Sequence, residues 1–183
     1  MKSYKVLDQQ EFTMGEYSIV PIRSKDRFDI MKWRNEQMYH LRQNESLTNE
    51  KQDIYFNNVI SKLFEQKKPD QILFSFLEND VCIGYGGLVH INWIDKNAEI
   101  SFILETSIVD KDFDFHLSLF LKFIEGVSSK QLNFHKIFTY AFDVRPEIYP
   151  ILEKNGFKKE AVFKEHCLIN GMFLNVIIHS KFI

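Results

Sequence analysis

The amino-acid sequence predicts a single α/β domain, in which helices flank a central mixed, largely antiparallel sheet. Two patterns support this fold class: apolar residues alternate in some segments as in strands, and recur at helical spacing in others. Hydrophobic residues make up 45% of the 183 residues, enough for a substantial core, and no Pro/Gly-rich linker divides the chain. We therefore expect one domain over residues 1–183.

The first third of the chain is expected to hold one strand and two helices. Apolar residues alternate over 16–22, and Ser24 is a plausible N-cap for a helix that continues through Asn35. A second helix is expected after Thr48, because acidic residues follow at once and apolar residues then recur at helical spacing as far as Phe64. These elements predict an order of strand, helix, helix.

Three antiparallel strands are expected next, over 72–77, 81–91 and 98–104. Short polar turns separate them. The run Gly84-Tyr85-Gly86-Gly87 lies inside the second of these strands and does not open a helix. It therefore predicts a bulge or a close-packing site, and not a nucleotide-binding loop.

The segment over 112–126 fits both the alternation of a strand and the spacing of a helix. Its length favours a helix, and Gly126 suits a helix end. A strand over 135–142 and a short helix that starts near Pro146 and ends before Gly156 follow.

A hairpin closes the chain, with strands over 161–169 and 172–178 joined by Asn170-Gly171. Asn-Gly is the dipeptide that a tight two-residue hairpin turn prefers. The predicted order is β-α-α-β-β-β-α-β-α-β-β.

Charge and cysteine usage exclude several classes of function. The 23 basic and 25 acidic residues nearly balance and are dispersed, so neither nucleic acid nor an anionic membrane is an expected partner. Cys82 and Cys167 lack the spacing of a zinc site or a disulfide framework. With no apolar signal segment at the N-terminus, we expect a cytoplasmic protein.

The order of elements resembles that of the GNAT superfamily of acyl-CoA-dependent N-acetyltransferases. The resemblance covers a core of about residues 17–183. Within the superfamily, the chain is similar to the branch that contains ribosomal-protein N-terminal acetyltransferases and amino-sugar acetyltransferases. It rests on short motifs in a shared order: Trp33-Arg34-Asn35, Ala98-Glu99-Ile100-Ser101-Phe102, Asn133-Phe134-His135-Lys136-Ile137, Leu152-Glu153-Lys154-Asn155-Gly156-Phe157 and Leu168-Ile169-Asn170-Gly171.

The resemblance implies that the chain moves acetyl from acetyl-CoA to a primary amine, without a metal. The acceptor would be a protein N-terminus, an amino sugar or another small amine, and a homodimer is compatible with the sequence. The main chain at Phe102, Ile103 and Leu104 would bind the pantetheine arm and polarise the thioester.

The same resemblance assigns a phosphate-binding loop to the run over 110–115. Relatives carry a basic, glycine-rich turn there, whereas this chain has Asp110, Lys111, Asp112, Phe113, Asp114 and Phe115. Three carboxylates would repel a pyrophosphate, and neither Asp nor Phe has the backbone freedom of glycine. Arg145 is an additional candidate for a phosphate contact, or else a solvated loop residue.

Glu99 is the candidate base, because its carboxylate on the strand over 98–104 could accept an amine proton through water. Its alternative role is a cross-strand pair. His90 and His116 are weaker candidates. The acid that protonates the leaving thiolate is unidentified, because Ile148 and Leu152 stand where relatives carry donors.

The resemblance implies that the acceptor is bound by the first two helices and by the hairpin between the final strands, and Arg34, Tyr39, Arg42 and Tyr85 are the candidate contacts. The arginines of this set could bind a carboxylate or a phosphate on the acceptor, or could lie on a solvated helix. The altered phosphate loop also motivates an alternative function, a non-catalytic GNAT-fold domain that has lost CoA.

Overall fold

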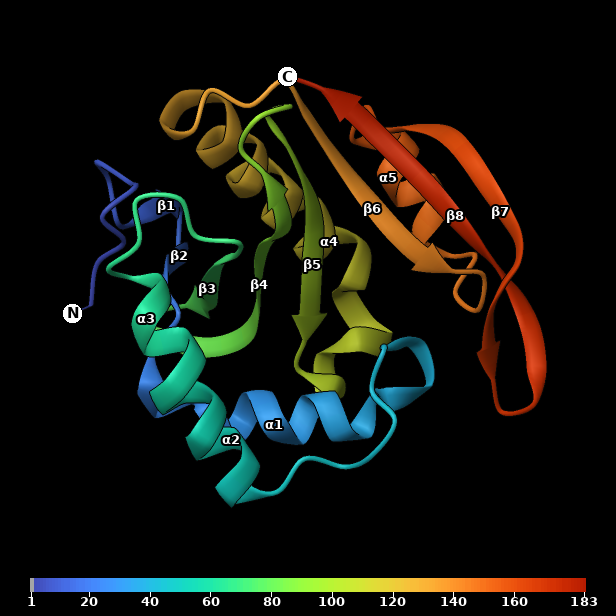
Figure 1. Cartoon of the computed structure of the whole chain (residues 1–183), viewed down its shortest axis with the longest axis horizontal. Helices are drawn as coiled ribbons and strands as arrows, with labels where there is room; N and C mark the ends of the chain where they lie inside the picture. The colour runs from blue at the N-terminus through green and yellow to red at the C-terminus, as the bar shows by residue number, and fades with distance from the viewer. Residues whose placement is uncertain (1) are drawn as a thin grey trace.

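The computed structural model describes residues 2–183, except the side chain of Asp110, and forms an eight-stranded sheet flanked by helices (Figure 1). The strands lie in the spatial order β1-β2-β3-β4-β5-β6-β8-β7. Their bounds are β1 Phe12–Met14, β2 Tyr17–Pro21, β3 Ile72–Glu78, β4 Val81–Asn92, β5 Asn97–Leu104, β6 Lys136–Phe142, β7 Lys158–Ile169 and β8 Met172–Phe182.

The helices fall into two groups, one before the central strands and one after them. The first group is α1 Arg27–Glu36, preceded by the 3₁₀ turn Ser24–Asp26 and followed by the 3₁₀ turn Met38–His40, then α2 Asn49–Tyr55, the π-helical turn Phe56–Ile60 and α3 Ser61–Leu63. The second group is α4 Thr106–Gly126 with the π-helical turn Val127–Gln131, and α5 Ile148–Lys154.

The predicted order of elements is confirmed, with β1 as an additional short strand. Thr48 caps α2 as predicted, because its Oγ1 accepts a hydrogen bond from the amide of Lys51. Ser24 does not cap α1: it lies in the preceding 3₁₀ turn, and Asp26 takes the N-cap position without a side-chain capping bond.

The central sheet opens between β5 and β6. These two strands pair in parallel only where Asn97 to Glu99 face Lys136 to Phe138. Beyond Glu99 they diverge, while β5 continues to pair with β4 as far as Leu104. Figure 1 shows β5 and β6 leaving a common end of the sheet and separating along their length. The edge of β5 beyond Glu99 that faces β6 therefore lacks a strand partner.

Aromatic packing fixes α4 on one face of the sheet. The ring of Phe102 on β5 stacks on Phe120 of α4 at a centroid distance of 4.4 Å, and Phe76 on β3 contacts both Phe120 and Phe123. Phe120 and Phe123 are almost completely buried. Burying such rings is among the largest apolar contributions that a core can have.

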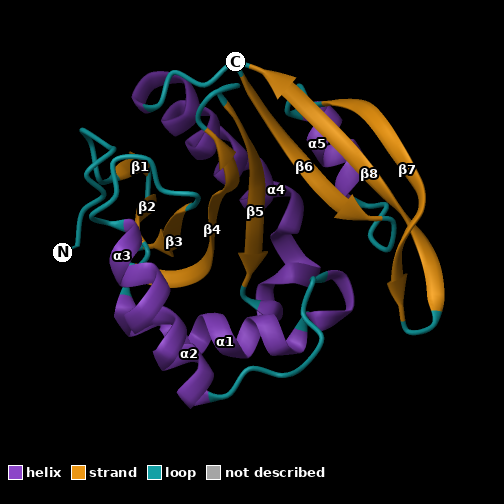
Figure 2. Cartoon of the chain, in the orientation of Figure 1, coloured by secondary structure: helices purple, strands orange, loops and turns teal. Residues whose placement is uncertain are grey.

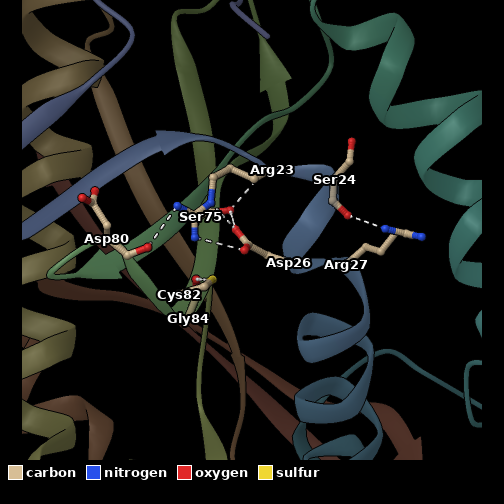
Figure 3. Close-up of polar contacts among 8 residues, drawn as sticks. All are labelled: Arg23, Ser24, Asp26, Arg27, Ser75, Asp80, Cys82 and Gly84. Atoms are coloured by element: carbon tan, nitrogen blue, oxygen red, sulfur yellow. Dashed lines mark hydrogen bonds and ion pairs between the residues drawn. The ribbon is translucent and has the colours of Figure 1, made fainter. Parts of the chain in front are cut away.

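Helix α1 covers the opposite face and is fixed by a buried ionic network at its start (Figure 3). Asp26 accepts hydrogen bonds from Nε and Nη2 of Arg23 at 2.6 and 3.0 Å, and from Oγ of Ser75 on β3 at 2.7 Å. The amide of Arg23 donates to the same Ser75 hydroxyl. This network ties the entry of α1 to the middle of the sheet.

The glycine run in β4 is a close-packing site, as predicted. A Cβ on Gly86 would lie 2.1 Å from the carbonyl oxygen of Ser101, and one on Gly87 would lie 2.0 Å from that of Ile72. Gly87 also has a φ of +151°, a conformation that L-residues rarely adopt. These glycines let β4 approach both neighbouring strands.

The Asn-Gly hairpin is confirmed as well, with Asn170 at φ +50° and Gly171 at φ +79° between β7 and β8. Figure 2 shows this two-stranded ribbon extending past the rest of the sheet. Within residues 2–183, no helix has both the length and the apolar character needed to cross a membrane.

Candidate active site

A cavity of about 530 Å³ occupies the opening between β5 and β6. Polar residues from several elements line it, namely Arg34, His40, Arg42, Asp70, Gln71, His90, Glu99, Ser101, Thr139, Tyr140 and Arg145. The remaining lining is mostly apolar: Leu41, Val89, Ile100, Phe102, Phe113, Leu117, Leu121, Ala141, Phe142, Ile148 and Leu152. A narrow apolar space with convergent polar groups is the usual form of a small-molecule site.

Both carboxylate oxygens of Glu99 are engaged at the closed end of this opening. Oε2 lies 2.8 Å from Nδ1 of His90, and Oε1 lies 3.4 Å from Nη2 of Arg42. The Glu99 side chain is 13% exposed, so water screens these contacts only in part. The guanidinium of Arg42 also lies over the ring of Tyr140, 3.9 Å from its centroid. The cross-strand alternative for Glu99 thus coexists with a place in the cavity.

Arg34 projects from α1 into the same cavity, and its hydrogen-bond partners are neutral. Its Nη1 donates to the hydroxyl of Tyr85 at 2.6 Å, and its Nε donates to Oε1 of Gln43 at 3.0 Å. The pKa of Arg34 is raised above its ordinary value, first by the negative charge that Tyr85 would carry if it ionised and also by the hydrogen bond to its hydroxyl, against the effect of burial. The guanidinium is therefore a fixed cation on the cavity wall.

Arg145 crosses the open end of the cavity. Its guanidinium lies 4.6 Å from the centroid of the Phe113 ring, and Nε pairs with Glu147 at 3.3 Å. Its Nη1 lies 3.1 Å from Nε2 of His40. Because a guanidinium only donates, this nitrogen of His40 must be the acceptor. Burial, and then the charge of Arg145, lower the pKa of His40 to about 4.

The run that the resemblance assigns to phosphate binding lies within a helix, which begins earlier than the predicted residue 112. Helix α4 starts at Thr106, immediately after β5, and includes the run over 110–115, with one non-helical residue, Asp112, at φ −135° and ψ +28°. The helix is held at its start by the end of α1, since Gln37 donates to the Leu104 carbonyl at 2.8 Å.

The kink at Asp112 has its own local contacts. The Asp112 carbonyl lies 2.9 Å from Nδ1 of His116, which must carry a proton because a carbonyl only accepts. Asp114 pairs with Lys154 of α5 at 3.2 Å. Phe115 packs against Tyr17 and His116, outside the cavity lining.

The structure gathers some of the predicted site residues and separates others. Those that line the cavity are Arg34, Arg42, Glu99, Phe102, Phe113 and Arg145. Those outside the lining are Tyr39, Tyr85, Ile103, Leu104, Lys111, Asp112, Asp114 and Phe115. Tyr85 is buried and orients Arg34, whereas Tyr39 is 52% exposed and lies against His40.

Sequence reasoning undervalued His90 and missed Asp70 and Tyr140. His90 contacts Glu99 directly, although strand alternation does not place it there. Tyr140 could have been found from the strand over 135–142, since it follows the residues that pair with β5. Asp70 lies in the connection before β3 and offers no sequence signal that distinguishes it from other surface carboxylates.

The apolar part of the opening suits a pantetheine thioester. Leu117 and Leu121 of α4 and Ile148 and Leu152 of α5 contribute apolar lining to the cavity. The unpaired edge of β5 supplies main-chain donors and acceptors beside them. Leu152 and Ile148 line the cavity but have no exchangeable proton, so the leaving-group acid is not at these positions. No cluster of three His, Cys, Asp or Glu side chains suited to a metal occurs among the residues described.

Comparison with solved structures gives the same fold. Spermidine N-acetyltransferase from Vibrio cholerae, in complex with CoA and spermine, matches with a TM-score of 0.80 and 20% identity, covering 91% of this chain and 95% of that one. A dodecameric structure of the same enzyme in an intermediate state matches with a TM-score of 0.74 and 19% identity, covering 91% and 94%. A comparison with curated proteins by sequence finds no match.

The sequence profile described as "Acetyltransferase (GNAT) domain" matches residues 19–178, which include every cavity-lining residue. This match covers most of the chain. The diverging strands β5 and β6 and the cavity between them agree with it. The protein therefore belongs to the acetyltransferase (GNAT) domain family, and it is an acetyltransferase.

Proposed function

We propose that the chain acetylates the primary amine of a small molecule that also carries an anionic group, such as a phosphorylated or nucleotide-linked amino sugar. The observation that carries this proposal is Arg34. It is a cavity-wall cation whose hydrogen-bond partners, Tyr85 and Gln43, are uncharged. The N–H groups that these two bonds leave, on Nη2 and Nη1, can donate to a carboxylate or a phosphate.

The other charges of the cavity support the same acceptor class. Three arginines and two carboxylates line the cavity. The charges of Arg42 and Glu99 offset each other, because these two side chains are in contact. Arg145 is offset by Glu147 outside the lining. Arg34 is thus the cation that an incoming anion would neutralise. A polycation would instead be repelled by the Arg34 guanidinium, in a space where charge repulsion is weakly screened, and only Asp70 would remain to attract it.

In this proposal acetyl-CoA lies along the opening with its thioester beside the unpaired edge of β5. Main-chain groups near Phe102 and Ile103 would hold the pantetheine arm and polarise the thioester carbonyl, as hydrogen-bond donors do in acyl transfer. Phe113 and Arg145, at the open end, would contact the CoA moiety, with Lys111 adding charge near the kink of α4. Glu99 would assist removal of the acceptor proton from the closed end.

A polyamine is the second candidate acceptor. It is favoured by the fold match to a spermidine N-acetyltransferase solved with spermine, and by the carboxylates of Asp70 and Glu99 in the cavity. The two candidates differ in the charge that Arg34 would meet. They therefore predict opposite effects of removing that charge.

The experiment is an acetyl-CoA-dependent thiol-release assay with three acceptor classes: amino sugar phosphates with a nucleotide-linked amino sugar, spermidine, and a short peptide with a free N-terminus. We expect turnover with the anionic amines, confirmed by the acetyl mass increment on the acceptor. Preferential turnover of spermidine would overturn the anionic assignment in favour of the polyamine. Absence of turnover with all three, together with no acetyl-CoA binding, would favour the non-catalytic domain.

A further inference from the structure

Regular strand alternation would direct the side chain of His90 away from Glu99. Val89 is the residue of β4 paired with Glu99 of β5, and directly opposed residues share a face of the sheet. His90, the next residue, should therefore point to the other face. Instead, Nδ1 of His90 lies 2.8 Å from Oε2 of Glu99.

A bulge in β4 accounts for this placement. The register shifts between Val89 and Asn92, and His90 has a φ of +48°, in the left-handed region. Bulges of this kind re-aim a side chain and are common beside active sites. A non-glycine residue in this region has a conformational cost, and such residues cluster at functional sites. Here the bulge turns His90 towards both Glu99 and the cavity.

The contact with Glu99 fixes the tautomer of the imidazole. At neutral pH a carboxylate only accepts, so the shared proton resides on Nδ1 of His90. Nε2 then keeps its lone pair. Because the side chain of His90 is 63% exposed and lines the cavity, this second nitrogen is accessible to a ligand. A carboxylate, an imidazole and an available lone pair form the arrangement from which histidine acts as a general base.

We propose that His90 is the catalytic base of the acetyl transfer and that Glu99 is its positioning residue; this assignment rests on the function proposed above. Nε2 takes one proton from the acceptor ammonium, and Glu99 stabilises the imidazolium that forms. The amine nitrogen then forms a bond to the thioester carbonyl carbon while the carbon–sulfur bond breaks. The departing thiolate takes up the second proton lost by the nitrogen, and His90 returns its proton to water.

Other charged groups around His90 set the conditions for this step. Glu99 faces it from β5, and Arg42 approaches Glu99 from the segment after the 3₁₀ turn. Asp70 lies beside the bulge, because its carbonyl accepts a hydrogen bond from the amide of Ile91 at 3.1 Å. Arg34 lines the same cavity from α1.

The test compares His90→Asn with wild-type protein and with His135→Asn. Asparagine tolerates a positive φ, so the bulge should persist, and His135 is an exposed histidine outside the cavity lining. We expect His90→Asn to lower kcat/KM for the acetylated amine about 100-fold, within the range of general-base effects, with little change in acetyl-CoA affinity. His135→Asn should behave as wild type.

The pH profile separates a base from a structural residue. In wild type, kcat/KM should fall through an inflection on the acidic side, because a protonated base cannot accept a proton from the acceptor amine. His90→Asn should remove this inflection, and Glu99→Gln should move it to lower pH while reducing turnover. A His90→Asn variant that keeps wild-type turnover and the same inflection would overturn the proposal.

A failed proposed function would give a different result, since wild type itself would then show no preference for an anionic amine or no turnover of any amine. Circular dichroism and thermal unfolding of His90→Asn show whether the fold is retained. If that variant unfolds, His90→Gln with the same pH series takes its place: loss of the inflection supports the proposal, and its persistence overturns it.

Discussion

Arg145 donates a hydrogen bond from Nη1 to Nε2 of His40 across the open end of the cavity, over 3.1 Å. This contact joins the connection between β6 and α5 to the 3₁₀ turn after α1. It requires a neutral imidazole, because a protonated His40 would present a donor to a donor. This contact at the open end therefore depends on the protonation of His40.

This relationship predicts a pH-dependent stability. The pKa of His40 is about 4 when folded, against about 6.5 for an ordinary histidine, so between these values the unfolded state binds more protons. The free energy of unfolding should therefore fall as pH decreases from 7 to 5, by about 1–2 kcal/mol from this residue. Urea denaturation at both pH values measures it.

The matched variant for this prediction is His40→Gln, which keeps an acceptor for Arg145 and does not titrate. Its loss of stability between pH 7 and pH 5 should be smaller than that of wild type by the same amount. An identical pH dependence in the two proteins would contradict the role of His40.

Arg34→Lys tests the acceptor assignment. Lysine keeps the charge but loses the planar fork that binds an anion through two hydrogen bonds. We expect KM for an anionic amine to rise about 10-fold, equivalent to about 1.4 kcal/mol, with a smaller change in kcat. A neutral amine of similar size serves as the control, and its KM should be nearly unchanged. If KM rises equally for the anionic and the neutral amine, Arg34 does not bind the anionic group of the acceptor.

Asp26→Asn should destabilise the fold by about 2–4 kcal/mol, because it leaves the Arg23 guanidinium, only 14% exposed, without its charged partner. The comparison is Asp53→Asn, which removes the more exposed pair with Arg27 and should cost less than about 1 kcal/mol. If chemical denaturation gave both variants the same loss in free energy of unfolding, the buried network at the start of α1 would stabilise the fold no more than the exposed pair.

Two glycine substitutions of opposite sign test the packing of β4. Gly86→Ala should destabilise by about 2–3 kcal/mol or prevent folding, since its Cβ would clash with the Ser101 carbonyl. Gly126→Ala, in helical conformation with open space around it, should stabilise by about 0.5–1 kcal/mol. Thermal unfolding of both variants measures the two changes in melting temperature. Changes of the same sign would contradict this description of the packing.

Local patterns were sufficient to predict most of the fold. Alternation and helical spacing depend on neighbouring residues, and Asn170-Gly171 adopts the two positive φ values that its turn requires. The start of α4 could not be predicted in this way. It depends on Gln37, which is distant in sequence and binds the Leu104 carbonyl and the Thr106 hydroxyl.

The candidate site could be predicted only in part, for a similar reason. Glu99 and Arg34 were identified because they lie within motifs that resemble those of the family. The placement of His90 depends on a bulge, and pairing with β5 sets the position of this bulge. The residue types at 89–92 do not predict the bulge. Contacts that depend on register between strands are not present in sequence periodicity.

The opening between β5 and β6 is the feature on which this account depends, and calorimetric titration with acetyl-CoA tests it most directly. Wild type and Val162→Trp, a substitution on the exposed β7, should bind with equal affinity, whereas Ala141→Trp, which fills the cavity lining, should lose binding while remaining folded by circular dichroism. Undiminished binding by Ala141→Trp, or no heat of binding by wild type at millimolar acetyl-CoA, would contradict the account.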